Sequence, residues 1–246
     1  MGEVAIRRQV EYAPGANHTL DVYYPPGWTA GDTAPAVIVV SGLSDVGAQQ
    51  FLGCRINEMA SFISWGRLLA ASGLIGITHT TGTNAADDVR TALRQIVASG
   101  AALGVDPHRI GLLAFSSHVP NALGLLMAEP GAIACAVLAY GFMLDLDGSM
   151  GVAEAQQIWR FANPAAGKSV DDLPLDVSLL IVRAGCDSFP QVNPSIDSFV
   201  AHALHRNLPL ALVNHPSGPH AFDLDDDSET SRQLVKQMLA FVQVNL

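Results

Sequence analysis

The sequence predicts an α/β protein built on a doubly wound, mostly parallel β-sheet. Two observations support this fold class: short runs of consecutive apolar residues rich in Val, Ile and Leu recur along the chain, and segments with helical periodicity alternate with them. Runs that are apolar at every position are typical of parallel strands, which helices cover on both faces. The expected parallel strands are Ala36–Val40, Leu74–Thr78, Ile110–Phe115, Cys135–Ala139, Val177–Val182 and Leu210–Val213.

The expected helices follow from apolar residues that recur at intervals of three and four. Between residues 84 and 103, apolar side chains recur with the i, i+4, i+7, i+8 spacing of one helix face. Acidic residues favour a helix N-terminus, so the stretch Asp225–Ser231 is interpreted as the start of a closing helix. Proline is tolerated in a first turn, and Pro120 therefore agrees with a helix that begins near Val119. Further helices are expected over Phe62–Ala71 and Ile196–Leu204.

The two ends of the expected sheet differ from its middle. Val4–Tyr12 and Thr19–Tyr24 show partial apolar alternation around the turn-like sequence APGANH, which predicts an antiparallel hairpin. Residues 141–174 contain no clear strand and are expected to form a short helical cap or insertion over the carboxyl end of the sheet. Residues 1–246 are interpreted as one domain with this cap segment.

Composition excludes several classes of partner. Only 15% of the residues are charged and the formal net charge is -10, so the chain lacks the clustered Lys and Arg of a nucleic-acid surface. The apolar region 122–144 is broken by Glu129-Pro130-Gly131, which indicates two buried elements rather than a membrane span. The first residues, MGEVAIRRQVEYAPG, lack the apolar core of a signal peptide. Cys54, Cys135 and Cys186 are widely spaced and form no Cys-x-x-Cys pair, so reduced thiols and a cytoplasmic location are expected.

Three polar residues follow three of the expected strands, in the order serine, acid, histidine. Ser116 follows Phe115, Asp187 ends RAGCD, and His220 ends NHPSGPH. Because ligands bind at the carboxyl ends of parallel strands, these side chains are expected to converge. A hydroxyl, a base and a carboxylate are the groups needed for nucleophilic catalysis.

Each role has a weaker alternative. Ser117 is the competing hydroxyl. His215 is less suited than His220 to act as the base, since it directly follows the strand and precedes proline. Asp197 lies inside a helical pattern and is the weaker acid. Asp145, Asp147 and Asp225–Asp227 match no metal-loop spacing, so no metal site is predicted.

In the motifs RIGLLAFSS, LLIVRAGCD and VNHPSGPHAF the chain resembles the α/β-hydrolase fold, and within it the dienelactone hydrolase-like family. The resemblance covers nearly the whole chain and implies Ser116 as nucleophile, Asp187 as acid and His220 as base, without a cofactor. Two departures stand out. Dienelactone hydrolases have cysteine where this chain has Ser116, which favours ordinary ester chemistry. The pentad Ala114–His118 also lacks both glycines of Gly-x-Ser-x-Gly, and His118 takes the place of the second.

The resemblance also implies an oxyanion hole. One donor is the backbone N–H of Ser117, and the other comes from the SGLSD loop after Val40, with Leu43 preferred over Gly42. Residues that are candidates to border the substrate are His118, Cys54, Arg55, His79 and Phe142.

The expected function is therefore hydrolysis of small carboxylic esters through an acyl-enzyme. Acyl transfer by the same triad and a non-catalytic ligand-binding role are the two alternatives. The expected partner is a small-molecule ester, with no nucleic acid and no membrane, and the sequence does not determine the oligomeric state.

Overall fold

The computed structural model describes residues 3–13 and 18–246, and its centre is an eight-stranded sheet. The strand order is β1-β2-β4-β3-β5-β6-β7-β8. β2 pairs antiparallel with both β1 and β4, whereas β4, β3 and β5 to β8 run parallel. The predicted mostly parallel sheet and the N-terminal antiparallel pair are confirmed; the turn predicted in APGANH falls on residues 14–17, outside the described residues. The strands are β1 (Ala5–Ala13), β2 (His18–Tyr24), β3 (Ala34–Val40), β4 (Ile75–His79), β5 (Val105–Phe115), β6 (Cys135–Ala139), β7 (Ser178–Cys186) and β8 (Leu210–Pro219).

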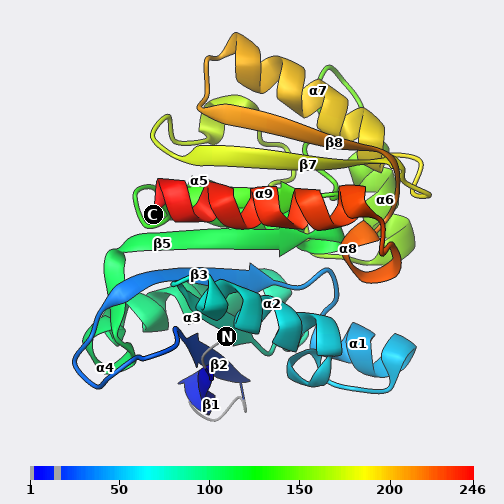
Figure 1. Ribbon diagram of the computed structural model, residues 1–246. Helices are drawn as coiled ribbons and strands as arrows, with labels where there is room; N and C mark the ends of the chain where they lie inside the picture. Colours follow the sequence, from blue (N-terminus) through cyan, green and yellow to red (C-terminus); the bar gives the residue numbers. More distant parts are fainter. Residues whose placement is uncertain (1–2, 14–17) are drawn as a thin grey trace.

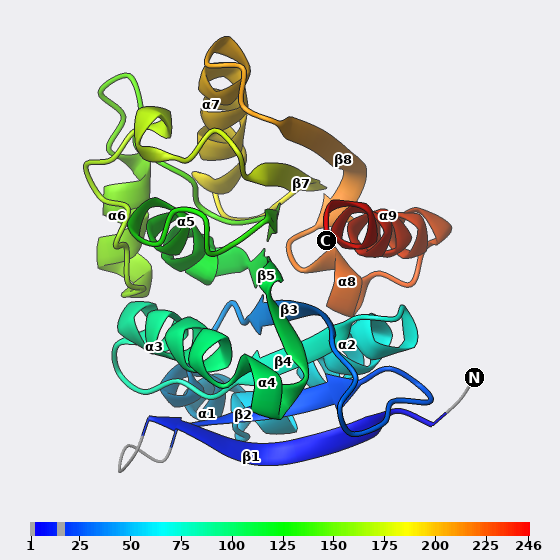
Figure 2. The same cartoon turned by 90° about the vertical axis from the view of Figure 1, so that its left-hand side faces the viewer.

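Helices cover both faces of the sheet (Figures 1 and 2). On one face lie α3, α5, α6 and α7, and on the other lie α2 and the closing helix α9, as the end-on view of Figure 2 shows. Apolar side chains at every position of Ala36–Val40 in β3, of Leu112–Phe115 in β5 and of β6 supply the two buried layers beneath these helices, which explains the apolar runs in the sequence. The helices are α1 (Asp45–Leu52), α2 (Ala60–Ala71), α3 (Ala85–Ala98), α4 (Gly100–Leu103), α5 (Val119–Ala128), α6 (Gly151–Trp159), α7 (Val192–His205), α8 (Phe222–Asp225) and α9 (Glu229–Asn245).

Several elements differ from their predicted extent. β8 continues six residues past the apolar run, to Pro219, because its backbone goes on pairing with β7 after its side chains become polar. The single helical pattern between residues 84 and 103 divides at Ser99 into α3 and α4. α1 was not predicted; its start is capped by Ser44, whose Oγ accepts a hydrogen bond from the Gly47 N–H.

The segment 141–174 contains α6 and a short 3₁₀ turn, Val170–Asp172, joined by irregular chain. α6 packs against α7, and Trp159 at its C-terminal end meets Phe189 edge to face, with ring centroids 5.1 Å apart. Within the described part of the chain, none of the helices has both the length and the apolar character that a membrane crossing requires.

Candidate active site

The pairing of β7 with β8 brings an acid and a histidine together. The register runs from Leu179 opposite Leu210 to Cys186 opposite Pro219, with an irregularity after Ala184. Asp187 follows the last residue of β7 and His220 follows the last residue of β8, so the two lie side by side at the end of the sheet. His220 Nδ1 lies 2.7 Å from Asp187 Oδ2.

Ser116 lies at a sharp turn between β5 and α5. Its φ is 52°, a left-handed conformation that non-glycine residues rarely adopt. A short 3₁₀ turn, Ser116–His118, then leads into α5, whose first turn contains Pro120. The prediction of a helix beginning near Val119 is confirmed. The strained backbone directs the Ser116 side chain away from the sheet and toward the loop that follows β8.

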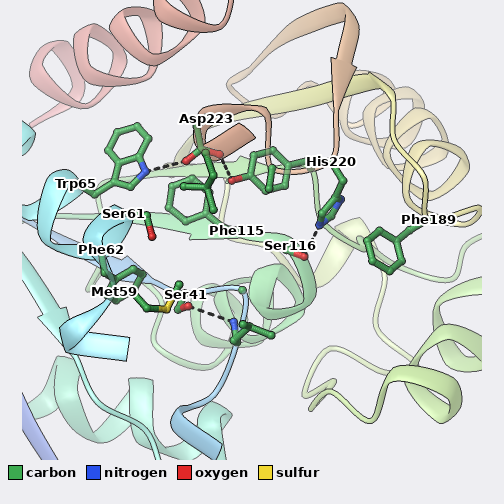
Figure 3. A pocket seen from close by; sticks show the side chains of 15 residues that line it. Ser41, Met59, Ser61, Phe62, Trp65, Phe115, Ser116, Phe189, His220 and Asp223 are labelled. Atoms are coloured by element: carbon green, nitrogen blue, oxygen red, sulfur yellow. Dashed lines mark hydrogen bonds between the residues drawn. The ribbon is translucent and has the colours of Figure 1, made fainter. Parts of the chain in front are cut away.

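A chain of hydrogen bonds joins the three side chains. Ser116 Oγ lies 2.7 Å from His220 Nε2 (Figure 3). The other ring nitrogen of His220 bonds to Asp187. The Asp187 side chain is fully buried, and its second oxygen accepts a hydrogen bond from the Phe189 N–H at 2.9 Å. A buried carboxylate held in this way favours the tautomer of His220 with the proton on Nδ1, which leaves Nε2 free to accept the serine proton.

A cavity of about 270 Å³ opens beside Ser116 Oγ and His220. Its wall is mostly apolar and aromatic, and Figure 3 shows Phe62, Phe115 and Phe189 around it. Two further residues at the cavity, Tyr140 and Ala221, have positive φ values of 38° and 56°. Strained backbone of this kind clusters at functional sites, where the surrounding fold holds it in place.

The loop after β3 forms one side of the cavity through Ser41, Gly42 and Leu43. Ser117 Oγ donates a 2.6 Å hydrogen bond to the Gly42 carbonyl oxygen, which ties the loop to the turn at Ser116. Because C=O and N–H of one trans peptide unit point in opposite directions, this bond also orients the Leu43 N–H. In this structure Ser41 Oγ accepts that N–H at 3.2 Å.

Each of the weaker alternatives, Ser117, His215 and Asp197, makes its contacts elsewhere. The Ser117 hydroxyl faces Gly42 rather than His220. His215 is buried and bonds Ser231 Oγ at 3.0 Å, at the start of α9, outside the cavity wall. Asp197 forms an ion pair with Arg183 on the surface.

None of the five residues expected to border the substrate lines this cavity. Phe142 is buried in the core, stacked on Phe161 with centroids 5.0 Å apart. Cys54 borders a neighbouring cavity, and Arg55 borders a third, polar one. The expectation that they touch the cavity is corrected: the chain after the Leu43 loop forms α1 and leads Cys54 and Arg55 away.

His118 and His79 lie behind the serine turn, in the interior. His118 is 5% exposed, and burial together with the neighbouring His79 lowers its pKa to about 4. A hydrogen bond to the Ser41 backbone partly offsets this shift of the pKa. Burial likewise lowers the pKa of His79. The imidazole of His118 therefore lies between the turn and the ends of β3 and β4. This interior space accommodates a side chain at a position where the usual motif has glycine.

Sequence reasoning missed a hydrogen-bonded cluster on the opposite wall. Asp223, three residues after His220, accepts hydrogen bonds from Tyr140 OH at 2.5 Å and from Trp65 Nε1 at 2.9 Å (Figure 3). The Tyr140 ring packs edge to face on His220, 5.2 Å between centroids. Tyr140 directly follows β6, so the strand-end rule could have found it; nothing in the sequence linked Trp65 to this wall.

No arrangement of three or more His, Cys, Asp or Glu side chains suited to a metal ion occurs in residues 3–13 and 18–246.

Comparison with known proteins shows the fold. No protein-family model matches the sequence, and no curated protein sequence is significantly similar to it. A thermophilic esterase from Thermogutta terrifontis superposes with a TM-score of 0.68 at 17% identity, covering 98% of this chain and 92% of the esterase. A fungal esterase from Rhizomucor miehei gives 0.71 at 15% identity, with coverages of 100% and 85%. An α/β hydrolase from a Medee basin deep-sea metagenome library gives 0.65 at 15% identity, with coverages of 98% and 99%. The chain has the α/β-hydrolase fold.

Proposed function

We propose that this protein is a serine hydrolase that cleaves small carboxylic esters through an acyl-enzyme. The observation that carries the proposal is the continuous hydrogen-bonded chain from Asp187 through His220 to Ser116, with both distances 2.7 Å, at the wall of a cavity. Two proteins of the same fold, from Thermogutta terrifontis and Rhizomucor miehei, are esterases, which agrees with ester chemistry.

The first half of the reaction forms the acyl-enzyme. Ser116 Oγ attacks the ester carbonyl carbon while His220 Nε2 takes the hydroxyl proton, and the carbonyl oxygen becomes an oxyanion. The N–H groups of Ser117 and Leu43 are the proposed donors to that oxyanion; Ser41 Oγ must then share or release the Leu43 N–H. Collapse of the intermediate breaks the bond to the alcohol oxygen, which leaves with the proton from His220.

The second half repeats these steps with water. His220 removes a proton from a water molecule, whose oxygen attacks the acyl carbon, and the proton then returns to Ser116 Oγ as the acid departs. Throughout, the Asp187 carboxylate stabilises the imidazolium through its hydrogen bond to Nδ1, and the Phe189 N–H holds the carboxylate in place.

The residues favour simple esters over dienelactones. A serine stands where dienelactone hydrolases have cysteine, so the resemblance to that family extends to the layout of the site but not to its nucleophile. A cavity of about 270 Å³ with a mostly apolar wall suits a short or compact acyl or alcohol part.

The test combines active-site labelling with turnover. A fluorophosphonate probe should label the wild type once per chain, at Ser116, and the protein should hydrolyse 4-nitrophenyl acetate. Ser116→Ala should abolish labelling and lower kcat by about 10⁴-fold or more. Ser61→Ala, which removes a different hydroxyl from the same cavity wall, is the matched control and should still be labelled. Turnover of a folded Ser116→Ala variant near the wild-type rate would refute the proposal.

A further inference from the structure

The carboxylate of Asp223 occupies an unusual place in the cavity wall. Asp223 lines the cavity beside Ser116 and a neighbouring one of about 470 Å³. It also borders a third cavity, of about 290 Å³, whose wall includes Arg232 and Lys236. It accepts hydrogen bonds from two side chains, Tyr140 OH and Trp65 Nε1, and from its own backbone N–H, and all three donors are neutral groups. Among the ion pairs of the described residues, none includes Asp223.

On the side of the cavity beside Ser116, the surroundings of this carboxylate are aromatic. Aromatic side chains of the described wall are Phe62, Trp65, Phe115, Tyr140 and Phe189. Of the described wall residues only His220 can become cationic, and its Nδ1 already faces Asp187. Burial raises the pKa of Asp223, and the nearby Asp225 carboxylate adds to that rise.

The neutral groups around such a carboxylate balance its negative charge only in part. Charged groups removed from water are normally paired with an opposite charge, because hydrogen bonds from neutral donors offset only part of the lost hydration. Aromatic rings attract cations through the negative potential of their faces, and a carboxylate among rings is therefore a favourable site for an ammonium group. The missing partner of Asp223 can then be supplied by the substrate.

We propose that the cavity selects esters that carry an ammonium group, with Asp223 as the counter-charge and the aromatic wall around it. This inference rests on the proposed esterase function and names its substrate class. The cationic group lies on the side of the ester that enters the cavity, at the wall formed by Asp223 and Trp65, while the carbonyl carbon faces Ser116 Oγ.

The experiment compares esters that differ only in charge. On the alcohol side, acetylcholine is paired with 3,3-dimethylbutyl acetate, in which carbon replaces the charged nitrogen. On the acyl side, the 4-nitrophenyl ester of 4-(trimethylammonio)butanoic acid is paired with that of 5,5-dimethylhexanoic acid. In at least one pair, kcat/KM of the wild type should be about tenfold or more higher for the cationic ester.

Three variants separate charge from structure. Asp223→Asn keeps the shape but removes the charge, so the cationic-to-neutral ratio of kcat/KM should fall to about one. Tyr140→Phe removes a hydrogen bond to Asp223 but leaves the carboxylate, so the ratio should persist even if both rates drop. Asp227→Asn is the matched control: it makes the same charge change at an exposed residue paired with Arg232, and should keep the wild-type ratio within about twofold.

Binding provides a readout that does not depend on turnover. Choline should bind the wild type about tenfold more tightly than its neutral isostere 3,3-dimethylbutan-1-ol, and this difference should vanish in Asp223→Asn. A ratio near one in both ester pairs, or a preference that Asp223→Asn leaves intact, would overturn the ammonium site while leaving ester hydrolysis standing. If none of the esters is hydrolysed, the esterase proposal fails instead, and the choline comparison still supports or overturns the ammonium site.

Discussion

Gly42→Ala adds one methyl group where the loop after β3 passes the serine turn. A Cβ built on Gly42 would lie 2.8 Å from Ser116 Cβ, 3.4 Å from the Phe115 carbonyl oxygen and 3.5 Å from Ser116 Oγ. The φ of Gly42 is not in the left-handed region, so alanine can adopt this backbone and the effect comes from the contact alone. The nearest atom, Ser116 Cβ, is fixed to the backbone of the turn and cannot swing aside.

The magnitude follows from the overlap. Carbon atoms in contact prefer separations of about 3.5 Å or more, so the loop or Ser116 must move by about 0.7 Å. Overpacking of this size costs about 1–3 kcal/mol of unfolding free energy, which lowers Tm by between about 2 and 12 °C in a chain of this length. A misplacement approaching 1 Å between the proposed nucleophile and the proposed oxyanion donors should lower kcat/KM by about 10²-fold.

Hydrolysis of 4-nitrophenyl acetate, the rate of fluorophosphonate labelling and thermal unfolding measure these effects. Gly47→Ala is the matched control in the same segment, since its added Cβ would meet nothing closer than 3.5 Å and alanine favours the helix that contains it. A Gly42→Ala variant that is labelled within about threefold of the wild-type rate would refute the reasoning. So would an equal loss of activity in Gly47→Ala.

Two further predictions concern the same turn. Ser117→Ala removes the hydroxyl that holds the Gly42 carbonyl oxygen. Because such a hydrogen bond contributes about 1 kcal/mol, kcat/KM should fall about fivefold while the fluorophosphonate probe still labels Ser116. Unchanged kinetics would contradict this positioning role of Ser117. Burial lowers the pKa of His118 from its ordinary 6.5 to about 4. Between these two pH values the unfolded chain binds a proton that the folded chain does not. The free energy of unfolding should therefore fall by up to about 3 kcal/mol as the pH drops from 6.5 through 4. His118→Gln should flatten this pH dependence in urea unfolding, and parallel curves for variant and wild type would show that His118 does not titrate in this way.

The sequence alone was sufficient for the architecture and for the order of the three proposed catalytic residues. Strands buried on both faces need apolar side chains, so β6 and the segments Ala36–Val40 of β3 and Ile110–Phe115 of β5 were visible as apolar runs. Parallel strands end at one edge of a sheet, which makes the residue after each strand a candidate for the site. Ser116 and Tyr140 both follow this rule directly, although only Ser116 was recognised.

Tertiary structure decided which of these residues meet. Asp187 and His220 adjoin because β8 continues to pair with β7 through polar residues that carry no strand signal. The His118 side chain lies in the interior beneath the Ser41 loop, and the sequence around His118 does not predict this orientation. Asp223 meets Trp65, 158 residues away along the chain. Periodicity reports whether a segment is buried, whereas the wall of a cavity is formed by contacts between distant segments, and their geometry depends on the packing of the whole fold.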